Sequence, residues 1–428
     1  MKTLIKGAKL VDPGNIVGHK DILINGDSIE AILNPGECKP LKTFKIIDAT
    51  KMFIVPGLID IHVHLREPGH EYKETIESGV KAAVKGGFTS IVSMPNTNPV
   101  NDNSQVTKFI LNRAKEIKLA KVYPSGAITK DLKGESLSEI YDMKQAGIVA
   151  VTDDGRPVED SNMMRRALEY CKGIDMSVFV HAEDLSIGDK GSMNEGKFST
   201  RFGIKGIPNT SESIMVERDI ALARVIKTHV HFCHISTKES VKAIRKAKKE
   251  GVNISCETAA HYFTLTDGDI KDYSSNFKMN PPLRSADDKK AIIEGLCDGT
   301  IDLIASDHAP HSMIEKDVEF DKAAFGIIGL ETSLPVSLNL VHNKFLTFED
   351  IIIKMSKNPA KILGIDNDIK PGNKADITII NPECEYEIDP EKFESKSRNT
   401  PFKNFKAKGS VFLTMVDGRI VFEGSNLY

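Results

Sequence analysis

The chain has no tryptophan, few cysteines and no long apolar run, and its charges nearly cancel. No segment approaches the ~20 apolar residues that a membrane span needs, and MKTLIKGAKLVDPG at the start lacks the apolar core of a signal peptide. Lysine and arginine number 57 against 60 aspartate and glutamate residues, a net charge of −3. With no basic excess to attract a polyanion, we expect neither nucleic acid nor a membrane as a partner.

The six cysteines stand singly in a chain of 428 residues, without the C-x-x-C pairs of a zinc knuckle. A chain of this length needs no disulfide scaffold, so we expect six reduced thiols in a cytoplasmic protein. Hydrophobic residues make up 40% and charged residues 27% of the sequence, which is the balance of a globular protein.

Short apolar runs alternate with segments of helical periodicity from about residue 56 to about residue 365. After the first run, Ile76, Val80 and Val84 fall at helical spacing, and Gly86-Gly87 stops the helix. Eight such units predict an α/β fold, a (β/α)8 TIM-like barrel over 56–365. An open doubly wound sheet is the alternative, but no G-x-G-x-x-G follows the first run. The eight runs are Leu58–Val63, Thr89–Met94, Val122–Gly126, Ile148–Thr152, Ser177–Val180, Val230–Cys233, Val252–Cys256 and Ile301–Ala305.

The two ends of the chain differ from the middle, because their apolar residues form strands separated by turn signals such as Asp12-Pro13-Gly14. Residues 1–55 and 366–428 are each too short to bury a core alone. We therefore expect both to combine into one small composite β-sandwich domain beside the barrel.

Histidines and carboxylates gather at the ends of the predicted strands. On a strand, residues i and i+2 face the same way, so His62 and His64 can reach one metal ion. Five of the eight predicted strands finish in such groups, at the end where barrel enzymes keep their chemistry. The ordinary alternative is turn-forming aspartates and solvent-facing histidines. The residues at these ends are His62, His64, Asp153, Asp154, His181, His234 and Asp307.

Four histidines and two aspartates exceed the needs of one catalytic zinc, which takes three protein ligands and a water. They suit two metal ions that share a carboxylate and a hydroxide. Imidazole together with carboxylate favours zinc over magnesium or calcium. The residues therefore predict a centre of two zinc ions.

Several motifs resemble those of one known family. Gly57-Leu-Ile-Asp-Ile-His-Val-His-Leu-Arg-Glu-Pro-Gly69 is similar to the first-strand motif of the dihydroorotases, within the amidohydrolase superfamily. The resemblance runs from about residue 50 to the end of the chain and is that of a class I bacterial dihydroorotase. The motifs that continue it are Met94-Pro-Asn-Thr97, Thr152-Asp-Asp-Gly155, His181-Ala-Glu-Asp184, His234-Ile-Ser-Thr237, Asn280-Pro-Pro-Leu-Arg284 and Ile304-Ala-Ser-Asp-His-Ala-Pro-His311.

The resemblance implies a role for each metal ligand. His62 and His64 would hold the first zinc together with Asp307, and His181 and His234 would hold the second. Hydantoinases, dihydropyrimidinases and some dihydroorotases place a carboxylated lysine at the bridging position after the fourth strand. This chain has no lysine there, and Asp154 matches the aspartate that replaces it; its neighbour Asp153 could be confused with it. Asp154 and a hydroxide would then bridge the two zinc ions.

The resemblance also implies the reaction, the reversible interconversion of N-carbamoyl-L-aspartate and (S)-dihydroorotate in de novo pyrimidine (UMP) biosynthesis. Asp307 would carry the proton between the attacking oxygen and the departing ring nitrogen. Arg66 can pair bidentately with a substrate carboxylate, although alone it would serve equally well in a surface salt bridge. The implied substrate contacts are Arg66, Asn96, Asn280 and His311, with the backbone of Phe325 and Gly326.

Three alternatives stay open. The first is another cyclic amidohydrolase, an allantoinase or hydantoinase, and the second is a catalytically dead scaffold on the same fold. The third is an assembly role beside the activity, because members of the family can dock onto aspartate transcarbamoylase; no residue identifies such a surface, or that of a homodimer. Residues 312–324 are charged and without periodicity, which is typical of a mobile loop over a site. His261, just past the seventh strand, is open between a structural and a functional role.

Overall fold

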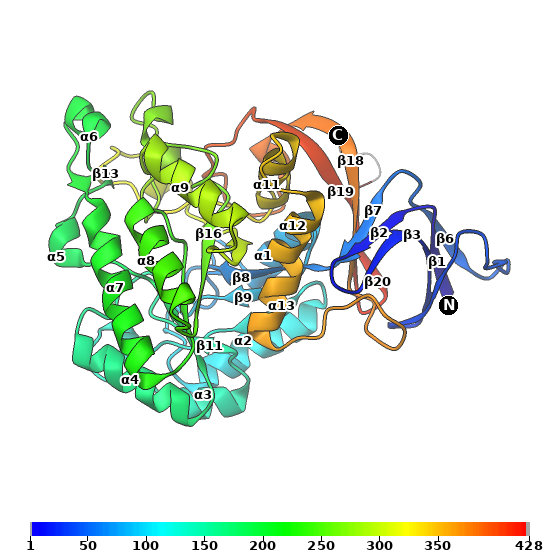
Figure 1. Ribbon diagram of the computed structural model, residues 1–428, viewed down its shortest axis with the longest axis horizontal. Coiled ribbons are helices and arrows are strands. Elements are labelled where there is room, and N and C mark those ends of the chain that lie inside the picture. The colour runs from blue at the N-terminus through cyan, green and yellow to red at the C-terminus, as the bar shows by residue number, and fades with distance from the viewer. Residues whose placement is uncertain (1, 425–428) are drawn as a thin grey trace.

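The computed structural model describes residues 2–424 of the chain. It has two parts that lie side by side, a barrel surrounded by helices and a smaller all-β part (Figure 1). Strands from the beginning and from the end of the chain meet in the smaller part. Along residues 2–424, no helix combines the length and the apolar character that crossing a bilayer requires.

Eight parallel strands form the barrel. Two ladders, β8 to β10 and β11 to β17, are joined at both of their edges. Gly126 pairs with Val151 at one seam, and Val63 pairs with His308 at the other. The sheet therefore closes on itself, and the predicted barrel is confirmed. Its strands are β8 (Leu58–Val63), β9 (Phe88–Ser93), β10 (Lys121–Pro124), β11 (Ala150–Val151), β12 (Ser177–Val180), β15 (Val230–Phe232), β16 (Ile254–Ala259) and β17 (Leu303–Ala305).

Helices cover the outside of the barrel. In α1 the Thr75 side chain accepts from the Ser78 N–H at the N-terminus, and Gly86 ends the helix. Its apolar face, which includes Val80 and Val84, is buried against the barrel. The covering helices are α1 (Ile76–Lys85), α2 (Ser104–Ile117), α3 (Ile140–Ala146), α4 (Ser161–Gly173), α7 (Asn209–Ile226), α8 (Lys238–Lys249), α9 (Ala286–Cys297), α11 (Ser333–His342), α12 (Phe348–Ile352) and α13 (Asn358–Leu363).

Short elements lie in the loops at the carboxyl ends of the strands. They are α5 (Leu185–Gly188), α6 (Lys197–Phe202), α10 (Met313–Lys316) and the paired strands β13 (Met193–Asn194) and β14 (Gly206–Ile207). Of these, α10 falls inside the segment 312–324 that the sequence analysis expected to be a mobile loop.

The seventh barrel strand lies later in the chain than Val252–Cys256, the run predicted for it. Val252 N–H donates to Ala247 O, so this residue completes the end of α8 instead of starting a strand. The strand β16 begins at Ile254 and extends to Ala259. This shift brings Glu257 inside the strand.

The smaller part is a β-sandwich built from both ends of the chain, as expected. A six-stranded sheet has the order β20-β19-β18-β7-β2-β3, and a four-stranded sheet the order β5-β4-β1-β6. Ile22, Ile54 and Leu413 belong to the core between them. The boundaries 1–55, 56–365 and 366–428 stay a prediction. The strands are β1 (Lys2–Lys6), β2 (Lys9–Asp12), β3 (Ile16–His19), β4 (Asp21–Asn25), β5 (Ser28–Leu33), β6 (Lys45–Asp48), β7 (Phe53–Pro56), β18 (Ile377–Glu387), β19 (Lys406–Val416) and β20 (Arg419–Glu423).

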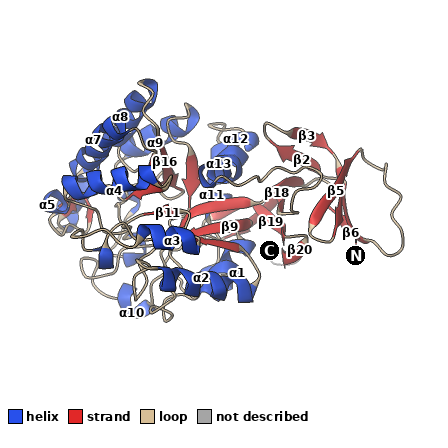
Figure 2. Cartoon of the chain, turned by 90° about the horizontal axis from the view of Figure 1, so that it is seen from below, coloured by secondary structure: helices blue, strands red, loops and turns tan. Residues whose placement is uncertain are grey.

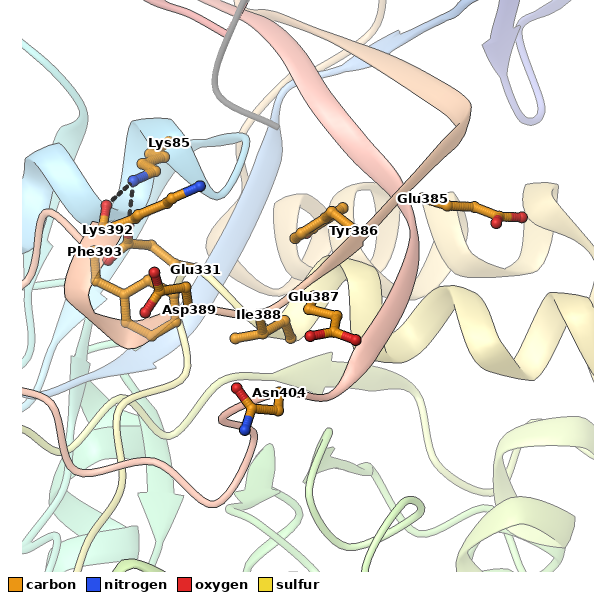
Figure 3. Close-up of a pocket in the computed structure, with 10 residues that line it drawn as sticks. All are labelled: Lys85, Glu331, Glu385, Tyr386, Glu387, Ile388, Asp389, Lys392, Phe393 and Asn404. Atoms are coloured by element: carbon orange, nitrogen blue, oxygen red, sulfur yellow. Dashed lines mark hydrogen bonds and ion pairs between the residues drawn. The ribbon is translucent and has the colours of Figure 1, made fainter.

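The view from below shows the strands of the sandwich at one end and the helix-covered barrel at the other (Figure 2). The segment between β18 and β19 returns to the barrel. There Lys85 of α1 lies 3.3 Å from Glu331 and donates to the Lys392 carbonyl, beside a cavity of about 470 Å³ (Figure 3). The residues that line this cavity include none of the predicted site residues. These contacts therefore hold the C-terminal segment against the barrel and stand apart from the site.

Candidate metal centre and substrate site

The six predicted metal ligands come together at the carboxyl ends of the barrel strands. Each follows or ends a strand, so the parallel arrangement of the barrel directs all of them to the same rim. None of the six is more than 6% exposed. They are His62 and His64 at the end of β8, Asp154 after β11, His181 after β12, His234 after β15 and Asp307 after β17.

The first group consists of His62, His64 and Asp307, whose candidate ligand atoms all lie within 4.8 Å of one another. Asp307 Oδ1 lies 3.3 Å from His64 Nε2 and 3.6 Å from His62 Nε2. Two imidazoles and one carboxylate at this spacing can share one metal ion.

The second group consists of Asp154, His181 and His234. His181 Nδ1 lies 2.9 Å from His234 Nε2, and Asp154 Oδ1 lies 3.5 and 3.2 Å from these two nitrogens. Asp154 also reaches the first group, because its Oδ1 lies 3.3 Å from His62 Nε2 and its Oδ2 lies 3.5 Å from His64 Nε2. One carboxylate thus stands between both groups.

The chemistry of this cluster fits a cation. His62 Nε2 is fully buried and makes no hydrogen bond with any residue in 2–424, although it faces two carboxylates. Burial lowers the pKa of His62, but the charges of Asp154 and Glu257 outweigh burial and hold this pKa well above its usual value. Burial likewise raises the pKa of Asp154, and the imidazoles around it hold it well below its usual value. An orphaned nitrogen beside ionised carboxylates is the donor set that a metal ion would satisfy.

The thiol of Cys233 also lies near His62 and Asp154. Burial raises the pKa of this thiol, which disfavours the thiolate form that binds a metal ion.

Asp153 and Asp154 could be confused with each other from the sequence alone, but their side chains have different surroundings. Asp153 Oδ1 accepts from the backbone N–H groups of Ile128 at 2.7 Å and Thr129 at 3.0 Å. Its carboxylate therefore anchors the loop after β10, and Asp154 is the one that contacts the histidines.

Three of the four histidines have a second polar partner on the ring nitrogen that faces away from the cluster. His62 Nδ1 lies 2.6 Å from Glu257 Oε1, His64 Nδ1 lies 2.9 Å from Asn96 Oδ1, and His181 Nε2 lies 3.1 Å from Glu183 Oε2. Such partners fix the orientation of a ligating imidazole. Sequence reasoning missed Glu183 and Glu257. Glu183 lies two residues after His181, and this spacing could have predicted it as a partner of that histidine. Glu257 was missed because the run predicted for its strand ended at Cys256, one residue too early.

The backbone takes left-handed φ angles at Arg66 (64°), His234 (34°) and Asp307 (48°). Non-glycine residues adopt this conformation at a cost of about 1–3 kcal/mol, and such strain clusters at functional sites. Here it occurs where the chain leaves β8, β15 and β17, and the surrounding barrel holds the side chains toward the common rim.

Arg66 and His311 are neighbours, as the predicted substrate pocket requires. Arg66 is 8% exposed, its Nε donates to Pro310 O at 3.2 Å, and one terminal nitrogen lies 3.4 Å from His311 Nε2. Burial lowers the pKa of Arg66 to about 10, so the guanidinium keeps its charge near neutral pH. Burial together with Arg66 and Lys73 lowers the pKa of His311 to about 2. A buried cation beside a neutral imidazole suits an anionic substrate and excludes an exposed surface salt bridge.

The remaining predicted contacts already have protein partners. Asn280 Nδ2 donates to Glu183 Oε2 at 2.8 Å, which links it to His181. Phe325 O lies 2.8 Å from His311 Nε2, and Gly326 N–H donates to Lys278 O at 3.0 Å. The structure thus groups Asn96 and Asn280 with the histidines, and Phe325 and Gly326 with Arg66 and His311.

The segment over this site is tied down by a buried lysine. Lys316, at the end of α10, donates to the carbonyl groups of Lys278, Ala324 and Gly326 at 3.2, 2.9 and 3.0 Å. The charged, aperiodic sequence of residues 312–324 predicts a mobile loop, and this mobility stays a prediction. His261 is also buried near the rim, and its Nε2 has no hydrogen-bond partner in the part of the chain that the structure describes.

A closed barrel whose rim carries four histidines and two aspartates defines a hydrolase of the amidohydrolase type, a metal-dependent class. Comparisons with known proteins narrow this assignment. The sequence profile described as "Dihydro-orotase-like" matches residues 51–240. The dihydroorotase of Desulforapulum autotrophicum is 60% identical over 418 residues, which cover 98% of each chain. That of Geobacter metallireducens is 51% identical over 99% of this chain and 100% of its own. The chain belongs to the dihydroorotase family.

Solved structures with the same fold include hydantoinases. The L-hydantoinase (dihydropyrimidinase) of Arthrobacter aurescens superposes with a TM-score of 0.90 at 25% identity, covering 99% of this chain and 96% of that one. The dihydropyrimidinase of Brevibacillus agri has a TM-score of 0.84 at 22% identity, with 99% and 95% covered. Both share the barrel and the β-sandwich.

Proposed function

We propose that the chain is a class I dihydroorotase, which interconverts N-carbamoyl-L-aspartate and (S)-dihydroorotate in de novo pyrimidine biosynthesis. The observation that carries this proposal is the juxtaposition of a six-ligand rim with a buried arginine, within a chain that matches dihydroorotases along nearly its whole length. Hydrolysis of a cyclic amide with a carboxylate substituent needs both features. The metal ligands serve the cleavage of the amide bond, and the arginine binds the carboxylate.

Two zinc ions are the metals we propose. His62, His64 and Asp307 would hold one ion, His181 and His234 would hold the other, and Asp154 would bridge them. The mixture of imidazole and carboxylate donors supports zinc. When bound, the ions would supply Lewis acidity, which would polarise the ring carbonyl and make the attacking water more acidic.

The chain's own residues would bind the substrate and move the proton. Arg66 would pair with the substrate carboxylate, and Asn96, Asn280 and His311 would orient the ring, with the backbone of Phe325 and Gly326 beside them. In hydrolysis a C–O bond forms at the ring carbonyl carbon and the C–N bond of the ring breaks. Asp307 takes a proton from the attacking water and delivers it to the ring nitrogen, and condensation reverses these steps.

The rival activities differ at the bridging position. A hydantoinase or allantoinase would be expected to have a carboxylated lysine there, whereas Asp154 would take this place in the present chain. The presence of all six predicted ligands at one rim argues against a catalytically dead scaffold.

Loss of the ultraviolet absorbance of dihydroorotate in the presence of the purified protein tests the activity. Allantoin and dihydrouracil serve as the control substrates. We expect turnover of dihydroorotate alone; preferential turnover of either control would reassign the substrate.

Metal analysis tests the centre independently. Reconstituted protein should hold close to two zinc ions per chain, and Asp154→Ala should lose the second ion selectively. A single ion in fully active wild-type protein would overturn the bridge.

The resemblance leaves a homodimer and association with aspartate transcarbamoylase as further proposals. Met313 and Ile314 of α10 are 76% and 85% exposed, and apolar side chains of this kind are what a partner protein covers. Light scattering of the protein alone, and mixed with aspartate transcarbamoylase, measures both associations.

A further inference from the structure

A continuous chain of buried polar groups leads from the metal cluster into the interior of the barrel. Glu257 Oε1 lies 2.6 Å from His62 Nδ1, and Glu257 Oε2 lies 3.2 Å from His231 Nε2. His231 Nδ1 lies 2.7 Å from Ser255 Oγ, which in turn lies 2.8 Å from His229 Nε2. His62, Glu257 and His231 are fully buried, whereas His229, just before β15, is half-buried.

The strand geometry explains how these side chains meet. Val230 and Phe232 of β15 belong to the core cluster between barrel and helices, so His231 between them faces the barrel interior. The same alternation on β16 turns Ser255 and Glu257 inward, where His231 also packs against the ring of Phe179 at 4.7 Å. Barrel interiors are ordinarily filled by apolar side chains, and burying polar groups costs free energy. A series of buried polar side chains at this place therefore indicates a role beyond packing.

With neutral imidazoles, the one carboxylate of this chain determines the hydrogen-bond roles along it. A carboxylate only accepts, so both imidazole nitrogens that face Glu257 must donate. His231 Nδ1 then accepts from the Ser255 hydroxyl, and Ser255 Oγ accepts from His229 Nε2. In the neutral form of His62, the form that binds a metal ion, the proton therefore sits on Nδ1 and the lone pair on Nε2. This Nε2 faces Asp154 and Asp307 and has no hydrogen-bond partner among the described residues.

We propose that Glu257, held in place by His231, is the positioning residue that fixes the ring orientation and tautomer of His62 for metal binding. This inference rests on the proposed metal centre and deepens it. Glu257 touches neither substrate nor reacting atoms in this proposal, and it acts only through His62. Carboxylate partners of this kind change metal affinity by about 10- to 100-fold.

Zinc affinity of the full-length protein tests this role. Metal-free protein is titrated with zinc against a chromophoric chelator, and the thermal midpoint of each metal-free variant is recorded. Glu257→Gln presents an amide N–H₂ to one of two imidazole donors, so we expect one of the two zinc sites to weaken 10- to 100-fold while the metal-free midpoint stays unchanged. Glu331→Gln is the matched control, a glutamate whose side chain is only 4% exposed and contacts Lys85 and backbone N–H groups instead; it should bind zinc as the wild type does.

A second pair of variants keeps the test valid if Glu257→Gln does not fold. His231→Gln retains an N–H donor for Glu257 and should keep zinc affinity within about threefold, whereas His231→Leu removes the donor and should weaken the same single site. Wild-type affinity in a folded Glu257→Gln protein, or an equal loss in Glu331→Gln, would overturn the proposal. Wild-type protein that binds no zinc would instead refute the proposed centre itself, so the two failures are distinguishable.

Discussion

Asn96 Oδ1 accepts a hydrogen bond from His64 Nδ1 at 2.9 Å. The family resemblance implies a substrate contact for Asn96, and this hydrogen bond gives the same side chain a second partner, a proposed metal ligand. This hydrogen bond involves the amide oxygen of Asn96 and does not involve its N–H₂ group. One residue can therefore orient His64 with one end and a substrate ring with the other.

Two substitutions should separate these duties of Asn96. Asn96→Asp keeps an acceptor oxygen for His64 but removes the N–H₂ donor, so zinc content should be preserved while KM for dihydroorotate rises about tenfold or more. Asn96→Ala removes both contacts and should lower zinc affinity as well, by about tenfold. Zinc titration and steady-state kinetics measure the two effects. An unchanged KM in Asn96→Asp would remove the substrate role.

Asp307→Asn tests the proton transfer. The amide keeps the shape and a coordinating oxygen but cannot carry a proton, so kcat in both directions should fall by about 10²- to 10⁴-fold with little change in substrate affinity. Kinetics with each substrate, together with metal analysis, measure this. Near-wild-type turnover with normal zinc content would transfer the role to another group, and buried His261 would be the next to substitute.

Arg66→Lys tests the carboxylate contact. Lysine keeps the charge but lacks the planar guanidinium group. We therefore expect kcat/KM to fall roughly 10- to 150-fold, a loss of about 1.5–3 kcal/mol in transition-state stabilisation. Arg113→Lys is the matched control, because Arg113 lies on the surface with a side chain 36% exposed; its kinetics should not change. Equal kinetics for both folded variants would exclude Arg66 from substrate binding.

Lys316→Met tests how the segment over the site is held. The substitution leaves three carbonyl groups without their common donor, so the free energy of unfolding should fall by about 1–3 kcal/mol and residues 312–326 should exchange amide hydrogen faster. Denaturant unfolding and hydrogen exchange measure these changes. Lys322→Met, whose side chain is 66% exposed on the same segment, should leave both unchanged. If the two variants behave alike, Lys316 does not hold the segment.

The sequence predicted the barrel and the rim ligands because both follow from local periodicity. The spacing of His62 and His64 on one strand shows directly that both side chains face the same way. Parallel strands of a barrel then bring such strand ends to one rim, and this does not depend on the sequences of the helices between them. Seven of the eight predicted runs overlap their strands closely. The remaining run, Val252–Cys256, begins before its strand β16 because Val252 completes the end of the preceding helix, an outcome that depends on a backbone hydrogen bond and not on residue type.

The partners of the ligands could not be predicted in the same way. The contact of Glu257 with His62 joins residues on β16 and β8, and no periodicity within either strand encodes it. The separation of Asp153 from Asp154 likewise depends on the N–H groups of Ile128 and Thr129, contributed by the loop after a different strand. Such pairings become visible only when the barrel is closed.

The composite sandwich has a consequence for how the protein is made. The strand β7 pairs along one edge with β2, which precedes it, and along the other with β18, where Val55 meets Thr378. During synthesis the first strands therefore leave the ribosome long before β18 is made. The edge of β7 that pairs with β18 stays unpaired while the entire barrel is synthesised. A chain that stops before residue 377 would lack not only its last strands but also the sheet that its first strands need.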